Sequence, residues 1–361
     1  MTSSCSGKYP LITNLNRVER FYSGGKLLDR WQGLSDENDG HMSEEFLVST
    51  IEYIGPGNPR ENGLSLVEYN EDLRSLRDLI NSDPVTFLGK NYAPVSEGHA
   101  CVLARAGDSL SRLIIQCHPD DTYARAHFGV PFGKTESWYI TGTRCVDGEN
   151  AHVYCGFKPG ITQQYWKELF DKQDTDAMLE ALHRFEVKKG DCILIEAGVP
   201  HAVGKGCLFI EVHQPCDITL RTERNFTPTP LSDEQMHYGA GFDILFKCFD
   251  YTGYTRDRMY EKAFMKPTVC NRSEGGTLYN LITYDDTRCL SVKKLVVESA
   301  FTIPSFDGHY LLVTAENEVI LQCDGETLHV PRGRGVFIPD ACSDIKVIGK
   351  AELIAAYPFS I

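Results

Sequence analysis

The chain has 361 residues, of which 42% are hydrophobic and 24% are charged, values typical of globular proteins. This length exceeds the roughly 100 to 200 residues of one domain, so we expect two domains. The formal net charge of −14 disfavours nucleic acids and anionic membranes as partners, because both bind basic surfaces.

Targeting and redox features point to the inside of the cell. The N-terminal sequence MTSSCSGKYPLITNLN lacks the basic start and apolar stretch of a secretory signal, and no apolar run approaches the ~20 residues of a membrane helix. The 13 cysteines are scattered, odd in number and without a CxxC pair, which favours reduced thiols over a disulfide framework. We therefore expect a cytoplasmic protein without a membrane partner.

Strand patterns dominate the chain, because short segments rich in β-branched and aromatic residues recur closely. Two helical patterns occur, over 69–83 and over 161–185. Between them lie predicted strands at 110–118, 137–143 and 151–157. After the second come predicted strands at 191–197, 207–213, 290–297, 310–315, 318–323, 326–330 and 335–340. The strands leave too little room for the helices of a parallel α/β fold. The sequence predicts an all-β fold of antiparallel sandwiches or barrels with minor helices.

An internal repeat indicates that the two domains are of one kind. Residues 187–206 align without gaps with residues 330–349, so that Gly190 matches Gly333 and Gly206 matches Gly349. The stretch NFTPTPLSD, which starts at Asn225, is rich in Pro and Thr and lies between the repeats. We therefore place the domains at 1–225 and 226–361.

The first repeat carries the pattern Gly-x5-Glu-x-Gly-x2-His-x3-Lys, which places His201 after a glycine turn. This pattern resembles the second cupin motif, in which such a His enters the mouth of a jelly-roll barrel. The resemblance implies two cupin barrels. In the second repeat Asp344 stands at the position of His201, so the C-terminal barrel is expected to be degenerate and without metal ligands.

Partners for His201 occur upstream. Gln116 and His118 flank Cys117 on a predicted strand, and alternation places the two polar side chains on one face and Cys117 on the other. Glu136 enters the following strand. One amide, two imidazoles and one carboxylate suit Zn2+, with manganese, iron or cobalt as competitors. Each residue alone would more often be an ordinary surface or sheet residue; their joint occurrence favours the metal site.

Three segments then resemble a known family. QCHPDDTYARAHFGVPFGKTESWYI, KKGDCILIEAGVPHAVGKG and IEVHQPCDITLRTER look like consecutive motifs of the zinc-dependent class I mannose-6-phosphate isomerases, in the order and spacing of the short bacterial type. The likeness covers most of residues 15–225. It implies that Gln116, His118, Glu136 and His201 hold one zinc ion.

The resemblance also implies a reaction, the interconversion of mannose 6-phosphate and fructose 6-phosphate through a cis-enediol. Arg221 would stabilise the anionic intermediate, Asp217 would orient Arg221 or share in proton transfer, and Lys134 would act as base or phosphate contact, its pKa lowered by the nearby metal cation. Glu211, with His213 nearby, is a further candidate. The family commonly has Ser two residues before the zinc-binding Gln, but Ile114 stands there. The phosphate anchor is therefore missing or supplied elsewhere.

Several alternatives stay open. The chain could act on another sugar or be a non-catalytic sugar-binding relative; an iron dioxygenase is disfavoured because those cupins commonly use His-x-His where this strand has Gln-x-His. Asp120 and Asp121 are expected to cap the following helical turn rather than bind metal. The remaining histidines lack partners at metal-ligand spacing and are expected to be surface or packing residues: His127, His152, His183 and His213. A monomer or a homodimer is expected.

Overall fold

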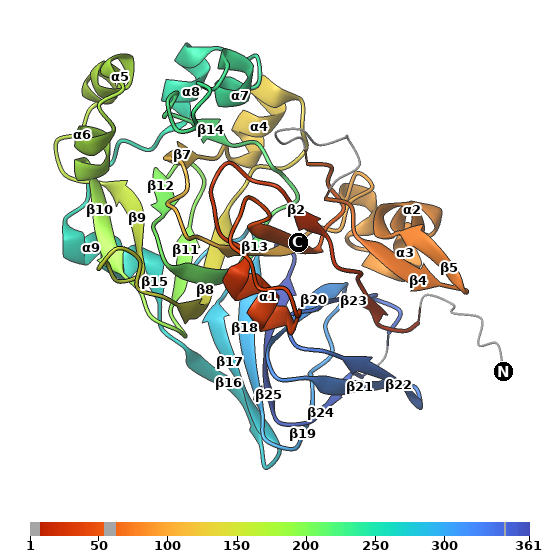
Figure 1. Cartoon of the computed structure of the whole chain (residues 1–361). Helices are drawn as coiled ribbons and strands as arrows, with labels where there is room; N and C mark the ends of the chain where they lie inside the picture. Colours follow the sequence, from red (N-terminus) through yellow and green to blue (C-terminus); the bar gives the residue numbers. More distant parts are fainter. Residues whose placement is uncertain (1–7, 54–62, 343) are drawn as a thin grey trace.

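The computed structural model describes residues 8–53, 63–342 and 344–361, so part of the N-terminal stretch inspected for a signal lies outside the described residues. Antiparallel strands form most of the fold, and the helices are short (Figure 1). This confirms the prediction of an all-β protein with minor helices. Within the described residues, none of the helices has the length and apolar character that crossing a membrane requires.

The first unit pairs a seven-stranded sheet with a five-stranded sheet. The larger sheet has the order β15-β11-β8-β13-β6-β3-β2, with β2 (Arg17–Val18), β3 (Glu44–Val48), β6 (Leu103–Asp108), β8 (Glu136–Thr143), β11 (Cys192–Ile195), β13 (Cys207–His213) and β15 (Phe264–Met265). The smaller has the order β10-β9-β12-β7-β14, with β7 (Gln116–Cys117), β9 (His152–Phe157), β10 (Leu182–Glu186), β12 (His201–Val203) and β14 (Leu220–Arg221). Apolar side chains such as Trp138, Ile193 and Phe209 fill the space between the sheets.

The second unit repeats this plan. Its larger sheet has the order β1-β23-β20-β25-β18-β17-β16, with β1 (Leu11–Ile12), β16 (Thr268–Ser273), β17 (Gly276–Ile282), β18 (Ser291–Val297), β20 (Tyr310–Glu316), β23 (Gly335–Ile338) and β25 (Ala351–Tyr357). Its smaller sheet has the order β19-β24-β21-β22, with β19 (Ala300–Thr302), β21 (Val319–Cys323), β22 (Glu326–Val330) and β24 (Lys346–Ile348). The predicted repeat appears as a strand, a turn and a second strand in each unit, and Gly190 and Gly333 open the two repeats with φ of 92° and 75°.

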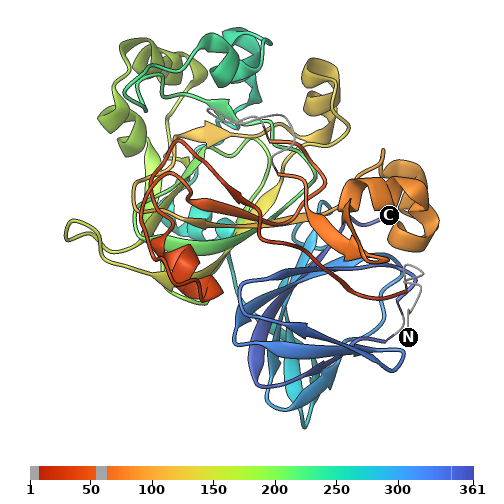
Figure 2. The ribbon, with the colours of Figure 1, turned by 45° about the vertical axis from the view of Figure 1, so that its right-hand side comes forward.

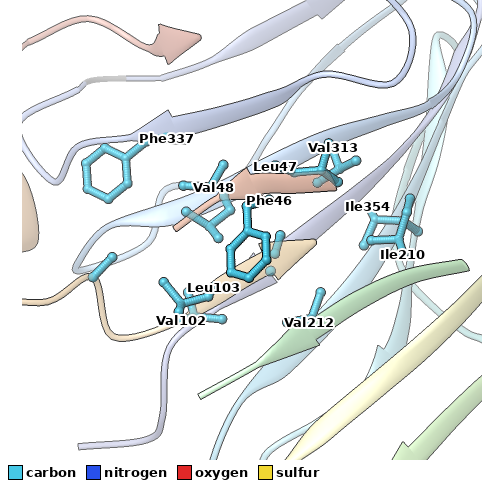
Figure 3. Close-up of a cluster of buried hydrophobic side chains, with 14 of the residues drawn as sticks. Phe46, Leu47, Val48, Val102, Leu103, Ile210, Val212, Val313, Phe337 and Ile354 are labelled. Carbon is cyan, nitrogen blue, oxygen red and sulfur yellow. The ribbon is translucent and has the colours of Figure 1, made fainter. Parts of the chain in front are cut away.

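One apolar core joins the two units. Figure 3 shows Phe46 and Val212 of the first unit near Val313 and Phe337 of the second, and all four side chains belong to one buried cluster. The large sheet of the first unit thus buries both faces, one inside its own barrel and one against the second unit. Side chains of β13 alternate accordingly, with Val212 facing the second unit.

Helices cover the end of the first unit where β7, β12 and β14 lie (Figure 1). These are α4 (Asp121–Phe128), α5 (Gln163–Lys172), α6 (Thr175–Glu180), α7 (Asp233–His237) and α8 (Phe242–Cys248). Trp166 of α5 and Phe246 of α8 pack in one cluster with Cys117. Cys117 therefore faces the helices on the outside of the small sheet, as the predicted alternation requires, and its two polar neighbours are left for the barrel interior.

The other helices lie at the edges of the barrels. They are α1 (Lys26–Gln32), α2 (Leu76–Ser82), α3 (Pro84–Leu88) and α9 (Arg256–Ala263), with a 3-10 turn η1 (Ala93–Val95). Figure 2 shows the small helices that precede η1 beside the C-terminal barrel, on the side opposite to α5 and α6. Helices therefore cover part of each unit.

The predicted helices and the first strand differ from the structure. Residues 69–83 contain a hairpin of β4 (Leu66–Tyr69) and β5 (Asp72–Ser75) before α2, and residues 161–185 contain α5, α6 and the start of β10. The strand predicted over 110–118 is regular only at Gln116–Cys117. Periodicity alone overestimated each of these elements.

The division into 1–225 and 226–361 stays a prediction, and the strand pairing qualifies it. β1 pairs with β23 of the second unit, whereas β15 pairs with β11 of the first. Short segments from each side of the predicted boundary therefore complete the sheet of the other unit.

Candidate metal centre

Three potential ligands converge inside the first barrel. His118 directly follows β7, Glu136 begins β8 and His201 begins β12, and their ligand atoms lie within 4.8 Å of one another. The Glu136 carboxylate lies 3.3 Å from Nε2 of His118 and 3.4 Å from Nε2 of His201. No other group of this kind occurs among the described residues. The structure thus brings together three of the four ligands predicted from sequence.

Main-chain carbonyls orient both imidazoles. Nδ1 of His118 donates to the carbonyl oxygen of Ile218 and Nδ1 of His201 to that of Val199, each at 2.8 Å. A carbonyl oxygen only accepts, so the proton is on Nδ1 and the Nε2 lone pair faces the carboxylate. Burial and the charge of Lys134 lower the pKa of His118 to about 3, and burial lowers the pKa of His201. Both rings are neutral near pH 7, as metal binding requires.

Glu136 supplies an ionised carboxylate. Burial raises its pKa, but the charge of Lys134 and the neighbouring His118 and His201 outweigh this effect and lower the pKa well below its usual value. Neither carboxylate oxygen accepts a hydrogen bond of good geometry from the described residues. Two converging lone pairs and a buried, ionised carboxylate fit a divalent metal ion.

Gln116 lies at the edge of this group. β7 pairs with β12 and β14, which places Gln116 opposite both His201 and Arg221, and the Gln116 amide lies 3.2 Å from Nε2 of His201. A half-turn of the amide exchanges its nitrogen and oxygen, so Gln116 can offer an oxygen to the same centre. The side chain is only partly buried, which distinguishes it from the other three ligands.

Lys134 lies against the three ligands. Its ammonium group is 2.7 Å from Glu136, 3.1 Å from Glu211 and 3.3 Å from Nε2 of His118, and the side chain is fully buried. Burial and Arg105 lower its pKa, but Glu136 and Glu211 raise it more strongly, so the pKa of Lys134 lies above its usual value. The protein's own charges therefore keep this lysine protonated.

A buried arginine that the sequence analysis missed organises the acids. Arg105 contacts Glu44 at 3.1 Å, Glu211 at 2.7 Å and Asp217 at 3.0 Å. Burial raises the pKa of Glu211 despite the charge of Arg105. The available signal was an arginine between two alanines in the strand LARAGD, where a buried charge needs partners.

Asp217 and Arg221 do not contact each other as predicted. Asp217 pairs with Arg105, and burial raises its pKa while Arg105, Arg20 and Lys134 lower it more strongly. Arg221 instead donates to the carbonyl oxygen of Gln235 at 2.6 Å and lies 3.4 Å from the hydroxyl of Tyr238. Arg221 forms no ion pair within the described residues, although its side chain is almost fully buried.

The other predicted positions have structural roles. Ile114 is buried in the apolar cluster under the helices, so it offers no polar contact to a ligand. Asp120 caps α4 by accepting a hydrogen bond from the amide of Tyr123 at 2.7 Å. Asp121 accepts from the amide of Gly133 at 2.7 Å and from the Gln214 side chain at 2.9 Å. The expectation that the two aspartates cap rather than bind metal holds for Asp120, and Asp121 ties α4 to the loop before Glu136.

Comparison of sequences finds related proteins over part of the chain, while no family model matches. A segment of 120 residues is 34% identical to the probable mannose-6-phosphate isomerase GmuF and 33% identical to the mannose-6-phosphate isomerase ManA, both of Bacillus subtilis. The segment makes up 33% of this chain and 36% of either relative, so it spans about a third of their length. The putative mannose-6-phosphate isomerase YvyI of Bacillus subtilis is 24% identical over 250 residues, 67% of this chain and 70% of YvyI.

Solved structures resemble the chain over nearly its whole length. The mannose 6-phosphate isomerase from Bacillus subtilis has a TM-score of 0.75 at 19% identity, covering 96% of this chain and 99% of that one. A putative mannosephosphate isomerase from Archaeoglobus fulgidus has a TM-score of 0.72 at 18% identity, covering 98% and 99%. The chain therefore has the fold of these proteins over nearly its whole length.

Proposed function

We propose that the chain is a metal-dependent aldose-ketose isomerase that interconverts mannose 6-phosphate and fructose 6-phosphate. The observation that carries the proposal is the buried group of His118, Glu136 and His201 in direct contact with Lys134. The sequence relatives and the structural neighbours, which are named as isomerases of this kind, support it. The division of the chain into a catalytic and a degenerate barrel is part of the proposal.

Gln116, His118, Glu136 and His201 would hold the metal ion, and we propose zinc on the basis of their donor atoms. When bound, such an ion acts as a Lewis acid and stabilises negative charge on a substrate oxygen. His118, Glu136 and His201 are almost completely buried. Protein groups, not solvent, therefore fix the positions of the two imidazoles and the carboxylate. This rigidity suits a site in which a small shift of charge must be stabilised.

Proton transfer between C1 and C2 of the sugar requires a group that accepts and returns one proton. Glu211 is buried, its pKa is raised by that burial, and it lies 3.1 Å from Lys134. We propose Glu211 as the proton carrier and Lys134 as the donor of a hydrogen bond to a substrate oxygen. Asp217, held ionised beside Arg105, would fix the position of that arginine and thereby of Glu211.

Arg221 is the residue that we propose for the phosphate. The other cations of the site are neutralised, Arg105 by three carboxylates and Lys134 by two, whereas Arg221 has a carbonyl oxygen and a tyrosine hydroxyl as partners. A planar guanidinium group that lacks a carboxylate partner suits a phosphate. This assignment would replace the serine anchor that is absent at Ile114.

Solvent exchange tests the reaction class. The zinc-loaded chain would be incubated in deuterated water with mannose 6-phosphate, other sugar phosphates and the free sugars. We expect deuterium at C2 of mannose 6-phosphate and at C1 of the fructose 6-phosphate formed from it, and much less in mannose. Exchange in free sugars alone would assign a substrate without phosphate, and exchange in none would leave a non-catalytic sugar-binding protein. Metal analysis after aerobic purification separates zinc from iron.

A matched pair of variants tests the assignment of the phosphate. Arg221→Gln is expected to raise KM for mannose 6-phosphate by about 10-fold to 100-fold, because a charge-assisted hydrogen bond contributes about 1.5 to 3 kcal/mol. Arg144→Gln, which removes an arginine paired with Asp39 and Asp108 elsewhere on the barrel, serves as control. The cytoplasmic location and the monomeric or homodimeric state stay predictions.

A further inference from the structure

One buried histidine of the first barrel has no role in the proposed chemistry. His213 ends β13, where it lies two residues from Glu211 and directly opposite Glu136 on β8. Side chains at i and i+2 share a face of a strand, and directly opposite residues of antiparallel strands project to the same side. His213 is fully buried, so it belongs to the inner wall of the candidate site and is not a surface residue.

The ring of His213 is oriented like those of the two ligand histidines. Its Nδ1 lies 2.7 Å from the carbonyl oxygen of Gln214, so Nδ1 holds the proton and Nε2 presents a lone pair. This Nε2 has no hydrogen-bond partner among the described residues. A buried acceptor left unsatisfied costs about 1 to 3 kcal/mol, and native proteins rarely contain one without a ligand or water to fill it.

The charges around His213 keep the ring neutral. Burial lowers its pKa, the neighbouring Arg105 and Lys134 lower it further, and Glu136 and Asp217 only partly oppose them, so that the pKa lies well below its usual value. His213 does not belong to the group of His118, Glu136 and His201, whose ligand atoms lie within 4.8 Å of one another. His213 is therefore a neutral hydrogen-bond acceptor beside the metal ligands rather than one of them.

We infer that Nε2 of His213 accepts a hydrogen bond from a hydroxyl group of the bound sugar, which makes His213 a specificity-determining residue. This inference rests on the proposed function, because it requires a polyhydroxy ligand in the barrel. A hydroxyl group is the donor that every sugar offers, and a water molecule is the other source of the same chemistry. Gln116 and Asp217 have partly exposed side chains, whereas His213 is fully buried.

Deoxy sugars combined with variants of His213 test the contact. The kcat/KM of the wild-type chain, His213→Gln and His213→Leu would be measured with mannose 6-phosphate and with its 3-deoxy and 4-deoxy analogues. We expect the kcat/KM of the wild type to be about 10-fold to 100-fold lower with one of the analogues, because the missing hydroxyl group leaves the buried acceptor unpaired. With mannose 6-phosphate, the kcat/KM of His213→Leu should be lower than that of the wild type by a similar factor. With that analogue, the kcat/KM of His213→Leu should fall almost no further.

The conservative variant and a control separate a contact from a structural role. His213→Gln keeps an acceptor at the end of the side chain and should restore most of the discrimination between the two sugars. His152→Leu, which removes a buried histidine whose Nδ1 also contacts a main-chain carbonyl, should leave the discrimination unchanged. Zinc content and the midpoint of thermal unfolding of each variant would show that the chain is folded and loaded.

Distinct outcomes overturn the inference. If the wild type turns over mannose 6-phosphate but tolerates every deoxy analogue within 3-fold, no hydroxyl reaches His213, and this result needs no variant. Equal penalties for the analogue with and without His213 would assign the lone pair to a water molecule. A wild-type chain that turns over no sugar phosphate would remove the proposed function and this inference together.

Discussion

At the scale of single residues, the site depends on imidazoles that main-chain carbonyls hold in one tautomer. His118 and His201 each donate from Nδ1 at 2.8 Å, so neither ring needs a second acidic side chain for its orientation. The carbonyls come from Ile218 and Val199, which lie in the short connections next to β14 and β12. The ligands are therefore positioned by the backbone of the barrel itself, and their geometry depends on the fold rather than on further side chains.

Replacement of a single ligand should weaken metal binding without unfolding the chain. His201→Ala removes one of three converging donors and is expected to weaken zinc affinity by at least about 100-fold, with loss of isomerase activity. His152→Ala serves as the matched control, since it removes a buried histidine outside the site. Zinc per chain after dialysis against a chelator is the measurement. A His201→Ala chain that keeps one zinc would contradict the assignment.

The convergence of His118, Glu136 and His201 could be predicted from sequence because each lies beside a strand or turn with a recognisable local pattern. The salt-bridge network could not, because Arg105 meets Glu44 and Asp217 only after distant strands are paired. The predicted contact between Asp217 and Arg221 fails for a physical reason. Residues four apart are neighbours on a helix, but this segment leads into the extended strand β14, where they are separated.

At the scale of elements, α4 is the connection between β7 and the loop that delivers Glu136. Asp120 begins the helix and Asp121 accepts hydrogen bonds from Gly133 and Gln214, so adjacent acids have different tasks. Asp120→Ala should lower the free energy of unfolding by about 1 kcal/mol, the usual value of a helix cap, and leave zinc affinity unchanged.

Asp121→Ala should have the opposite profile. It frees the loop of Gly133 to Glu136, so zinc affinity is expected to fall by about 10-fold, a value seen for groups that support metal ligands. Competition with a chromogenic chelator measures the affinity, and urea unfolding of the zinc-free chain measures the stability. Equal effects of both variants on zinc affinity would show that α4 as a whole, not its Asp121 contact, positions Glu136.

The hairpin of β4 and β5 explains one error of the sequence analysis. The helical pattern over 69–83 is correct from Leu76 onward, but Asn70 and Glu71 adopt φ of 53° and 68° and reverse the chain before that. Such a two-residue turn is ordinarily announced by glycine at its second position, and a glutamate there gives no such signal. The pairing of β4 with β5 therefore determined the conformation of the first part of this segment, although its local propensity was helical.

At the scale of the whole molecule, a histidine in the joint core links stability to pH. His309 is fully buried, accepts from the amide of Cys101 through Nε2, and has its pKa lowered by burial to about 4. The unfolded chain binds a proton near pH 6.5 and the folded chain does not, so this contribution is complete above pH 6.5 and is lost as the pH falls toward 4. His309 alone should reduce stability by about 2 kcal/mol between pH 7 and pH 5.

His309→Gln isolates this term, because its amide oxygen can still accept from Cys101 but does not titrate. The free energy of unfolding in urea, measured at pH 7 and pH 5, should fall by about 2 kcal/mol less in the variant than in the wild type. The same pH dependence in both chains would show that His309 is solvated, or protonated, in the folded state.

The shared core also predicts how the two barrels unfold. Phe337 of the second barrel lies in one buried cluster with Phe46, Val48 and Leu103 of the first, and β1 and β15 each complete the sheet of the opposite unit. Separation of the barrels would expose this apolar surface, so we expect one calorimetric transition for the whole chain.

Phe337→Ala should lower the free energy of unfolding by about 3 to 5 kcal/mol and shift that single transition to a lower temperature, since it leaves a cavity in the core between the barrels. Phe301 lies in the separate interior of the second barrel, and Phe301→Ala should shift the single transition in the same way. Two resolved transitions, of which only one moved in each variant, would mean that the barrels fold as independent domains and that the joint core contributes little to their coupling.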